Sequence, residues 1–162
     1  MESMSSAQVT LWDIRKDDLT SDEVRDLIRL HLEGMHEHSP QDGVFALDLS
    51  GLMATTVTVW TAWTVTKIAG VGALKDLGDR TGEVKSMRTH PEFLRRGVAA
   101  ALLEHIIATA RAKGLMRLSL ETGSGSYFDP ALSLYRRRGF LTGEPFADYK
   151  KTNFNQFLHL TL

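Results

Sequence analysis

The sequence predicts a mixed α/β sheet whose elements follow one another in the order β-α-β-β-β-α-β-α-β-β. Two observations support this prediction. Short runs rich in valine, threonine and aromatic residues, or with alternating apolar residues, are typical of strands. Longer segments with apolar residues at i, i+3 and i+4 spacing, bounded by helix-start or helix-end signals, are typical of amphipathic helices.

The first half of the chain is expected to hold one strand, one helix and three further strands. Weak alternation from Gln8 to Ile14 indicates the first strand. Thr20 and Glu23 have the spacing of a capping box, and the apolar residues that follow predict a helix to about Glu37. A Ser-Pro-Gln-Asp-Gly stretch then breaks the chain, and Val44 to Met53 is compatible with a short helix or an ordered loop. The three strands are expected at Thr55–Thr64, Lys67–Leu74 and Thr81–Thr89.

The second half alternates helices with strands. Gly97 opens a segment with apolar residues at helical spacing, and Gly114 lies just past its end, where C-cap glycines occur. Asp129 is expected to be the N-cap of the last helix, with Pro130 in its first turn and Gly139 at its end. The strands of this half are expected at Leu115–Glu121 and Phe154–Leu162.

Length and composition limit the classes of protein to consider. At 162 residues and 18.1 kDa, the chain fits one domain, residues 1–162. The absence of cysteine excludes disulfides, thiolate metal sites and a cysteine nucleophile. The formal net charge is −1 and the basic clusters are short, so we expect no nucleic-acid partner. No apolar run approaches the roughly 18 to 20 residues of a membrane span, so we expect no membrane partner and a cytoplasmic location.

The segment around Gly97 has the properties of a phosphate-binding helix start. A helix N-terminus presents unpaired backbone N–H groups and a partial positive charge, which together suit an anion. Beyond Val98 the first turn contains only alanine, so an anion can come close to the backbone. Arg95 and Arg96 lie immediately before the glycine. We therefore expect a phosphate-bearing cofactor here.

Two motifs resemble those of the GCN5-related N-acetyltransferase (GNAT) superfamily of acetyl-CoA-dependent enzymes. Residues 94–99 (Leu-Arg-Arg-Gly-Val-Ala) occupy the place of the family's Gln/Arg-x-x-Gly-x-Gly/Ala motif, and residues 131–140 match Ala-x-x-x-Tyr-x-x-x-Gly-Phe. Asp148, Tyr149 and the strand after them are similar to a bacterial subgroup of small GNAT proteins that includes YsnE. The resemblance covers Gln8 to the C-terminus. It implies an acyl-CoA acyltransferase fold with about seven strands and helices on both faces.

The resemblance also implies that acetyl-CoA is the co-substrate and that no metal takes part. Backbone N–H groups from Arg95 to Ala100 are expected to hold the pyrophosphate, with added charge from Arg95 and Arg96. The pantetheine arm is expected to pair with backbone groups of Met87 and Thr89. The residues predicted to bind the cofactor are Met87, Arg88, Thr89, Arg95, Arg96, Gly97, Val98, Ala99 and Ala100.

The sequence departs from the family pattern at two positions. Leu94 stands where the family usually has Gln or Arg, which matters little if the backbone binds the cofactor. Phe128 stands where many members have Asn, so a side-chain amide that often positions the cofactor is missing.

Acetyl transfer to an amine requires a neutral nucleophile, an oxyanion partner and a proton for the leaving thiolate. By resemblance, Tyr135 is the candidate acid beside the thioester sulfur; the alternative is a core aromatic residue on the apolar helix face. Glu83, fourteen positions before Gly97, is the candidate base, acting directly or through water. The alternatives are a solvated strand glutamate, or water alone as the base. The N–H near Met87 is the expected oxyanion donor.

Four further residues are candidates for the acceptor pocket. His36 and His38 follow the first helix, and Tyr127 and Tyr149 are aromatic residues whose alternative role is packing. The histidines of this region, including His31, match no His-Glu-x-x-His spacing, so no metal site is expected.

The leading hypothesis is an N-acetyltransferase that moves an acetyl group directly to the amine of a small molecule or peptide in a ternary complex. The alternative is a non-catalytic acyl-CoA-binding or regulatory module. The sequence leaves the acceptor open among amino acids, polyamines, antibiotics, peptide N-termini and protein lysines. The resemblance is also compatible with a homodimer.

Overall fold

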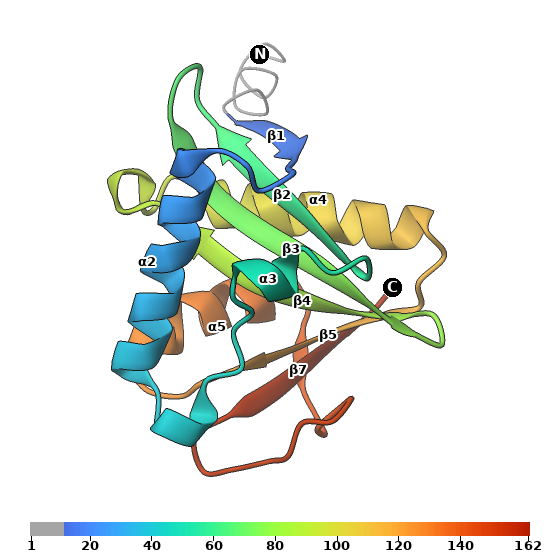
Figure 1. Ribbon diagram of the computed structural model, residues 1–162. Helices are drawn as coiled ribbons and strands as arrows, with labels where there is room; N and C mark the ends of the chain where they lie inside the picture. Colours follow the sequence, from blue (N-terminus) through green and yellow to red (C-terminus); the bar gives the residue numbers. More distant parts are fainter. Residues whose placement is uncertain (1–11) are drawn as a thin grey trace, which may run out of the picture.

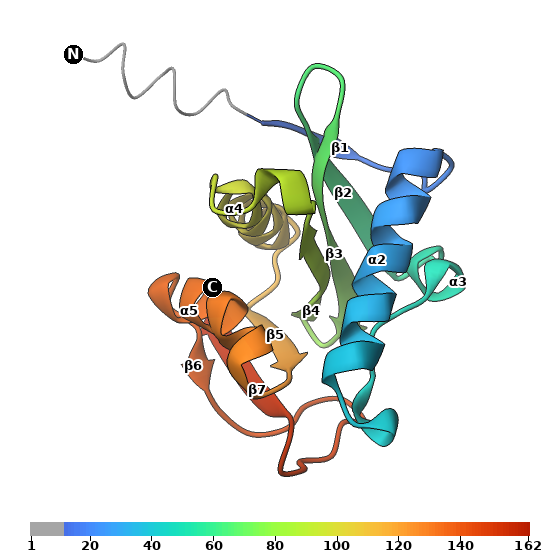
Figure 2. The ribbon, with the colours of Figure 1, turned by 90° about the vertical axis from the view of Figure 1, so that its left-hand side faces the viewer.

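The structure, a computed structural model, describes residues 12–162 and is a single seven-stranded sheet with helices on both faces. Figure 2 shows α4 and α5 on one side of the sheet and α2 with α3 on the other. The predicted mixed α/β fold is confirmed. The helices are α2 (Asp22–His38), α3 (Leu49–Leu52), α4 (Val98–Ala112) and α5 (Asp129–Arg137). The strands are β1 (Asp13–Lys16), β2 (Val57–Trp63), β3 (Ile68–Gly78), β4 (Thr81–Thr89), β5 (Arg117–Thr122), β6 (Leu141–Thr142) and β7 (Gln156–Thr161).

The sheet has the order β1-β2-β3-β4-β5-β7-β6, and its pairs are antiparallel except β4 with β5. The parallel pairing is short, since it joins Thr81–Glu83 of β4 to Arg117–Ser119 of β5. Both strands continue beyond it, β4 to Thr89 and β5 to Thr122, without pairing to each other. The sheet is therefore split along this line, with a free edge of β4 facing a free edge of β5 (Figure 1).

Strand β4 contains a bulge close to the split. The β3–β4 register shifts between Val71, opposite Arg88, and Ala73, opposite Lys85. Ser86 takes a φ of 58° in this irregular stretch, a conformation that non-glycine residues rarely adopt. A bulge adds one residue to one strand, so the side chains after it are turned to the opposite face.

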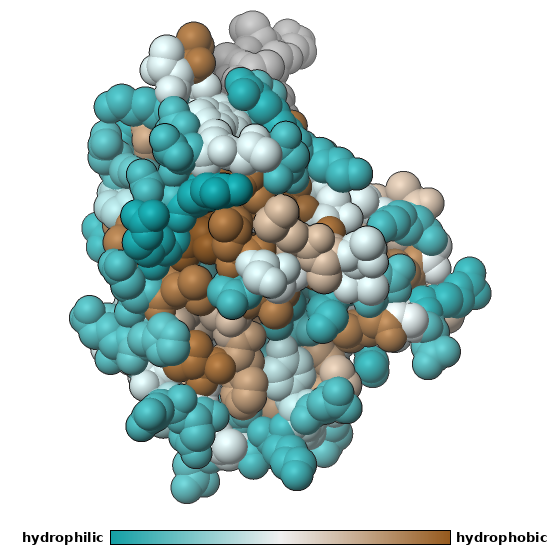
Figure 3. Space-filling model, in the orientation of Figure 1, coloured by the Kyte–Doolittle hydropathy of each residue, from teal (hydrophilic) through white to brown (hydrophobic). Residues whose placement is uncertain are grey.

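Two apolar cores hold the layers together. The larger packs α4 and α5 against one face of the sheet, with Ile106, Leu118 and Leu158 among its fully buried residues. The smaller packs α2 and α3 against the other face through Leu27 and Leu52. On that face apolar side chains gather near the centre and polar side chains surround them (Figure 3).

Glycine allows the close packing of α4 on the sheet. A Cβ on Gly70 would lie 2.6 Å from Val98, and one on Gly72 would lie 2.6 Å from the Met87 sulfur. Both distances are shorter than real side-chain contacts, so neither position accepts a side chain without displacing its neighbours. This packing places the N-terminus of α4 directly beside β4.

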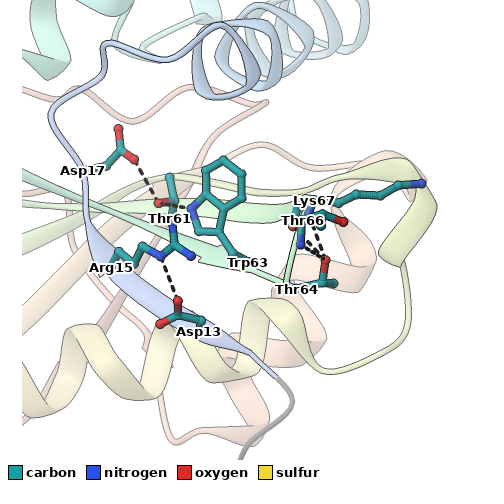
Figure 4. Close-up of polar contacts among 8 residues, drawn as sticks. All are labelled: Asp13, Arg15, Asp17, Thr61, Trp63, Thr64, Thr66 and Lys67. Carbon is teal, nitrogen blue, oxygen red and sulfur yellow. Dashed lines mark hydrogen bonds and ion pairs between the residues drawn. The ribbon is translucent and has the colours of Figure 1, made fainter.

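The edge strand β1 is held by a satisfied polar network (Figure 4). The Thr61 hydroxyl is fully buried, donates to the Asp17 carboxylate at 3.0 Å and accepts from the Trp63 indole at 2.8 Å. The Arg15 guanidinium lies 5.1 Å from the Trp63 ring centroid and donates to Asp13 at 2.8 Å. Each of these polar groups has a partner, including the buried Thr61 hydroxyl, as a stable network requires.

Two predicted helix caps are wrong by one residue. The N-cap of α2 is Ser21, whose hydroxyl accepts from the Val24 N–H, whereas Thr20 donates to Asp18. Asp129 is the first residue of α5 and not its N-cap, because a 3₁₀ turn over Ser126–Phe128 leads directly into the helix. In α2 the adjacent Ser21 supplies the cap, whereas Phe128, the N-cap of α5, makes no side-chain capping hydrogen bond.

Most strand predictions agree with the structure within a few residues. The first predicted strand, Gln8 to Ile14, lies mostly outside the described residues, and β1 begins at Asp13. The last strand begins at Gln156, later than predicted, because Asn155 and Thr152 form a hydrogen-bonded turn before it. Residues 44–53, which the sequence left open, contain the one-turn helix α3.

Candidate active site

A cavity of about 650 Å³ opens where β4 and β5 separate. Its volume lies within the range typical of small-molecule sites. It extends from the start of α4 along β4 to the residues between β4, β5 and α2. The predicted site residues that line it are Glu83, Met87, Arg88, Thr89, Arg95, Gly97, Val98, Ala99, Ala100, Tyr127 and Tyr135.

The start of α4 presents free backbone donors to this cavity. Ala101 N–H donates to Gly97 C=O at 3.0 Å, the first helical hydrogen bond of this turn. Within residues 12–162, no acceptor is found for the backbone N–H groups of residues 95–100. Gly97 takes a φ of 84° and a Cβ there would meet nothing within 4 Å, so the turn is open on its outer side. Such a turn suits a phosphate group.

The two arginines before Gly97 differ in position. Arg95 lines the cavity and takes a φ of 62°. Arg96 does not line it, and its guanidinium lies 5.6 Å from the Phe93 ring centroid. Arg137 of α5, which belongs to one of the short basic clusters of the sequence, lines the cavity instead. The geometry thus places Arg95 and Arg137 at the cavity and Arg96 on its outer side.

Tyr135 projects from α5 and is buried, with an exposed fraction of 6%. Its ring packs edge-to-face against Phe140, with 5.6 Å between the centroids. Its hydroxyl has no hydrogen-bond partner among residues 12–162. Burial raises the pKa of this phenol above its usual value, so it keeps its proton at neutral pH. A protonated phenol in a cavity is a group that can donate a proton.

Glu83 belongs to a buried polar triad. Its carboxylate accepts from Lys85 Nζ at 3.0 Å and from the Tyr149 hydroxyl at 2.5 Å. Lys85 Nζ also donates to the Tyr149 oxygen at 2.8 Å. Burial, together with the adjacent Glu83 charge, raises the pKa of Tyr149. Tyr149 does not itself line the cavity, but it orients a carboxylate and an ammonium that do.

A second carboxyl group, Glu121 of β5, lies near this triad. Burial raises the pKa of Glu121 to about 7, with opposing effects from the charges of Lys85 and Glu83. Glu121 lines the cavity, so two carboxyl groups from the separating strands face it. Sequence reasoning missed Glu121, because the pairing of β5 beside β4 is not visible in either strand alone.

The bulge at Ser86 determines where Arg88 points. Simple alternation would place Glu83, Lys85 and Met87 on one face of β4 and Arg88 on the other. Instead, Met87 lies against Gly72 and α4, whereas Arg88 lies next to Gly34 of α2. The Arg88 side chain therefore shares a face with Glu83 and Lys85, and it donates to the Tyr127 hydroxyl at 2.5 Å.

The predicted acceptor histidines are only partly at the site. His36 is exposed and does not line the cavity. His38 stacks on Tyr127, with 3.8 Å between ring centroids, and pairs with Glu37. His31 of α2 is buried and also lines the cavity. In the described part of the chain, no group of three or more His, Cys, Asp or Glu residues is placed to hold a metal ion.

Residues 17–140 match the Acetyltransferase (GNAT) family. The chain belongs to this family. The Escherichia coli K12 N-acetyltransferase YedL is 47% identical over 152 residues, which cover 94% of this chain and 96% of YedL. The Bacillus subtilis 168 N-acetyltransferase YsnE is 49% identical over 136 residues, or 84% of this chain and 90% of YsnE. The resemblance to GNAT proteins of the YsnE type is thereby confirmed, and the chain is an N-acetyltransferase by family.

Solved GNAT structures share the fold. A Klebsiella pneumoniae protein described as an acyl-CoA N-acyltransferase superposes with a TM-score of 0.79 at 27% identity, covering 94% of this chain and 98% of its own. A Bacillus subtilis acetyltransferase in complex with CoA gives 0.69 at 21% identity, covering 93% and 99%. The predicted acyl-CoA acyltransferase fold is confirmed. Across residues 12–162, no helix is long and apolar enough to cross a membrane.

Proposed function

We propose that this GNAT protein binds acetyl-CoA and transfers its acetyl group directly to an amine in a ternary complex. One observation carries the proposal: a single cavity joins the free N–H groups at the start of α4, the unpaired edge of β4 and the phenol of Tyr135. An extended acyl-CoA needs these features in this order, namely phosphate donors, a backbone edge for its amide-rich arm and a proton donor at the sulfur.

The cofactor would be held chiefly by the backbone. The amides of residues 95–100 would receive the pyrophosphate, with charge from Arg95 and Arg137. The pantetheine arm would pair with the free edge of β4 at Met87 and Thr89, in the gap that β5 leaves. The departures at Leu94 and Phe128 fit this arrangement, because Leu94 is exposed and Phe128 is buried against Phe154.

The chemistry would proceed by attack of the neutral amine nitrogen on the thioester carbonyl carbon. A C–N bond forms, the C–S bond breaks, and coenzyme A leaves as a thiol after taking a proton from Tyr135. The amine loses one proton to a carboxylate or water as it becomes an amide, and the Tyr135 phenolate regains a proton from solvent. A backbone N–H beside Met87 would stabilise the oxyanion.

Glu83 is the proposed base, with Glu121 as the second carboxyl group within the same part of the cavity. Glu83 is held in place by Lys85 and Tyr149. The pKa of Glu121 is about 7, and a general base works best when its pKa lies near the pH at which the enzyme operates. Comparing the pH profiles of kcat for Glu83→Gln and Glu121→Gln identifies the base, because loss of the base removes the inflection that this carboxyl group contributes, whereas any inflection from the amine itself stays in both variants.

The proposal is tested by a matched pair of glycine variants. Gly97 and Gly78 have nearly the same φ, 84° and 83°, and open space around a new side chain. Gly97→Glu places a carboxylate at the phosphate site and should weaken acetyl-CoA binding at least about 100-fold in calorimetry, by charge repulsion. Gly78→Glu, in the β3–β4 hairpin, should leave the affinity unchanged. Equal effects of the two variants would refute the assignment of the turn.

Turnover is tested separately. The protein is incubated with acetyl-CoA and a library of amines while free thiol is measured. Release that depends on the amine supports acetyl transfer. Tight binding of acetyl-CoA without release for any amine would instead identify the non-catalytic acyl-CoA-binding module.

A further inference from the structure

Arg88 is a cation without an acidic partner at one end of the cavity. The bulge turns it toward α2, where it contacts Tyr127 and fills the space that Gly34 leaves. A Cβ on Gly34 would lie 2.4 Å from the Tyr127 oxygen and 3.0 Å from Arg88 Nη2. Within residues 12–162 no Asp or Glu pairs with Arg88, whereas Lys85 on the same strand face is paired with Glu83.

The neighbours of Arg88 are hydrogen-bond donors without negative charge. Because the Tyr127 oxygen accepts from Arg88, the proton of its hydroxyl remains free to be donated. His31 is 8% exposed, lines the cavity, and its Nδ1 has no partner in the described part of the chain. Burial and the Arg88 charge lower the pKa of His31 to about 4, so it is neutral near pH 7 and does not add to the positive charge.

A partly buried guanidinium with adjacent neutral donors is the arrangement that binds a carboxylate. Without a ligand, the orphaned Nδ1 of His31 costs stability because it is buried without a partner, and the partly buried charge of Arg88 has only the neutral Tyr127 oxygen as acceptor. A carboxylate that accepts from Arg88, Tyr127 and His31 would satisfy all three groups.

The opposite end of this part of the cavity is acidic. Glu83 and Glu121 lie on the separating strands, beyond Lys85. A positively charged amine is attracted to these carboxyl groups and loses its proton there. A molecule with a carboxylate at one end and an amine at the other therefore matches both ends of the acceptor region.

Apolar side chains also line this cavity. Met35 and Phe45 line the cavity, and Phe45 packs edge-to-face on Tyr149 at 5.3 Å between centroids. These groups favour an apolar or aromatic body on the acceptor over a second charge.

We infer that the acceptor is an amino acid with a free carboxylate, which Arg88 binds, and with an apolar side chain. This inference rests on the proposed function and specifies its acceptor. Arg88, so far assigned to the cofactor, would then bind the acceptor through its side chain, while its backbone stays on the cofactor strand.

The test compares each of the twenty common amino acids with its α-amide, which keeps the amine and removes the negative charge. For the wild-type enzyme, kcat/KM of the best apolar amino acids should exceed that of their amides about 100-fold, as expected for a desolvated charge pair. In Arg88→Gln, the ratio of kcat/KM for an amino acid to kcat/KM for its amide should fall to within about threefold of one. The main cause should be a lower kcat/KM for the free amino acid. Arg88→Lys should keep part of the preference, since it keeps the charge but not the two-pronged geometry.

Arg29→Gln is the matched control, because Arg29 is exposed on α2 and paired with Asp26. Arg29→Gln should show the same ratio of kcat/KM between amino acids and their amides as the wild-type enzyme. Equal acids and amides in the wild type, faster amides, or an equal loss for both in Arg88→Gln would overturn the inference while leaving acetyl transfer intact.

If no amine is acetylated, the proposed function fails, and binding still decides the inference. Calorimetry of the CoA-loaded protein should then show the apolar amino acids binding at least tenfold more tightly than their amides. Equal binding, or no binding of either, would overturn it.

Discussion

Two polar clusters of this protein are built in opposite ways. At the β1–β2 edge, Thr61, Asp17 and Trp63 satisfy one another, and the hydroxyl at the centre is fully buried. In the cavity, the Nδ1 of His31 and the hydroxyl of Ser86 are buried without partners among residues 12–162, and Arg88 lacks an acid there. A satisfied cluster stabilises the fold, whereas an unsatisfied one keeps bonding capacity for a ligand. Within the same cavity the Glu83 triad is satisfied, so the free bonding capacity lies at the Arg88 end rather than at the carboxylate end.

The largest expected effect concerns the phenol of the cavity. Tyr135→Phe should lower kcat about 100-fold or more by removing the proton donor, while acetyl-CoA affinity changes less than about threefold. Stability should hardly change, because the hydroxyl has no partner within the described residues. Stopped-time thiol assays, calorimetry and urea unfolding check the three quantities. A loss of rate below about threefold would make Tyr135 a packing residue.

The structural cluster should respond in the opposite way. Thr61→Val leaves the Asp17 carboxylate and the Trp63 indole without their common partner, which should lower the free energy of unfolding by about 1–3 kcal/mol. The acetylation rate should stay unchanged at temperatures where the variant is folded. Thr58→Val, on the same strand and without a side-chain hydrogen bond among the described residues, should cost less than about 0.5 kcal/mol. Similar losses for both variants would contradict the role of the network.

The contribution of Glu121 to the free energy of unfolding should fall as pH rises. Its pKa in the folded protein is raised from 4.5 to about 7, so the folded state holds its proton more tightly than the unfolded chain. Its contribution to stability is present below about pH 4.5 and is lost as pH rises to about 7. After allowance for its partial exposure, Glu121→Gln should gain about 1–2 kcal/mol relative to the wild type between pH 5 and pH 8, measured by urea unfolding. No change in the difference with pH would refute the shift.

Substitution of His31 should change the free energy of unfolding least, and the contribution of His31 to stability should depend on pH in the opposite sense to that of Glu121. Its pKa is lowered from 6.5 to about 4, so its contribution to stability is lost as pH falls from 6.5 toward 4. His31→Leu removes the orphaned Nδ1 and should raise the free energy of unfolding at pH 7 by about 1 kcal/mol or less. The variant should also lose the fall in stability at low pH, so that the slope due to Glu121 becomes visible. A destabilised His31→Leu at pH 7 would place His31 with the structural cluster.

Much of the site follows from local sequence. The turn around Gly97 combines a positive φ, small residues and a helix start, and each of these properties resides in a few consecutive residues. Strand β4 was predicted at the residues it occupies, Thr81–Thr89. Tyr135 and Glu83 were predicted from the resemblance to the GNAT family, Tyr135 through the second motif and Glu83 through its place fourteen positions before Gly97. Both line the cavity, although their roles stay predictions.

The missed residues have a common cause. Lys85 and Glu121 become neighbours of Glu83 because β5 pairs with β4 for three residues and then leaves it. Arg88 was predicted as a site residue on this strand, but the direction of its side chain was not, because the bulge at Ser86 reverses the alternation expected for a regular strand. Neither the separation of β5 from β4 nor the bulge is indicated by the sequence of the strand. The bulge occurs at Ser86, without a glycine or proline that would mark it.

The amino-acid sequence alone determined the order of strands and helices and the turn around Gly97 that is proposed to bind phosphate, because these depend on contacts between residues close in the chain. It also carried the two motifs that indicate the family. Strand register, the split between β4 and β5 and the face on which Arg88 lies were decided only by the tertiary structure. They depend on how α2 and α4 pack against the two faces of the sheet, where close contacts at Gly34, Gly70 and Gly72 select one arrangement. Such packing sums contacts between residues far apart in the chain, so no short stretch of sequence contains it.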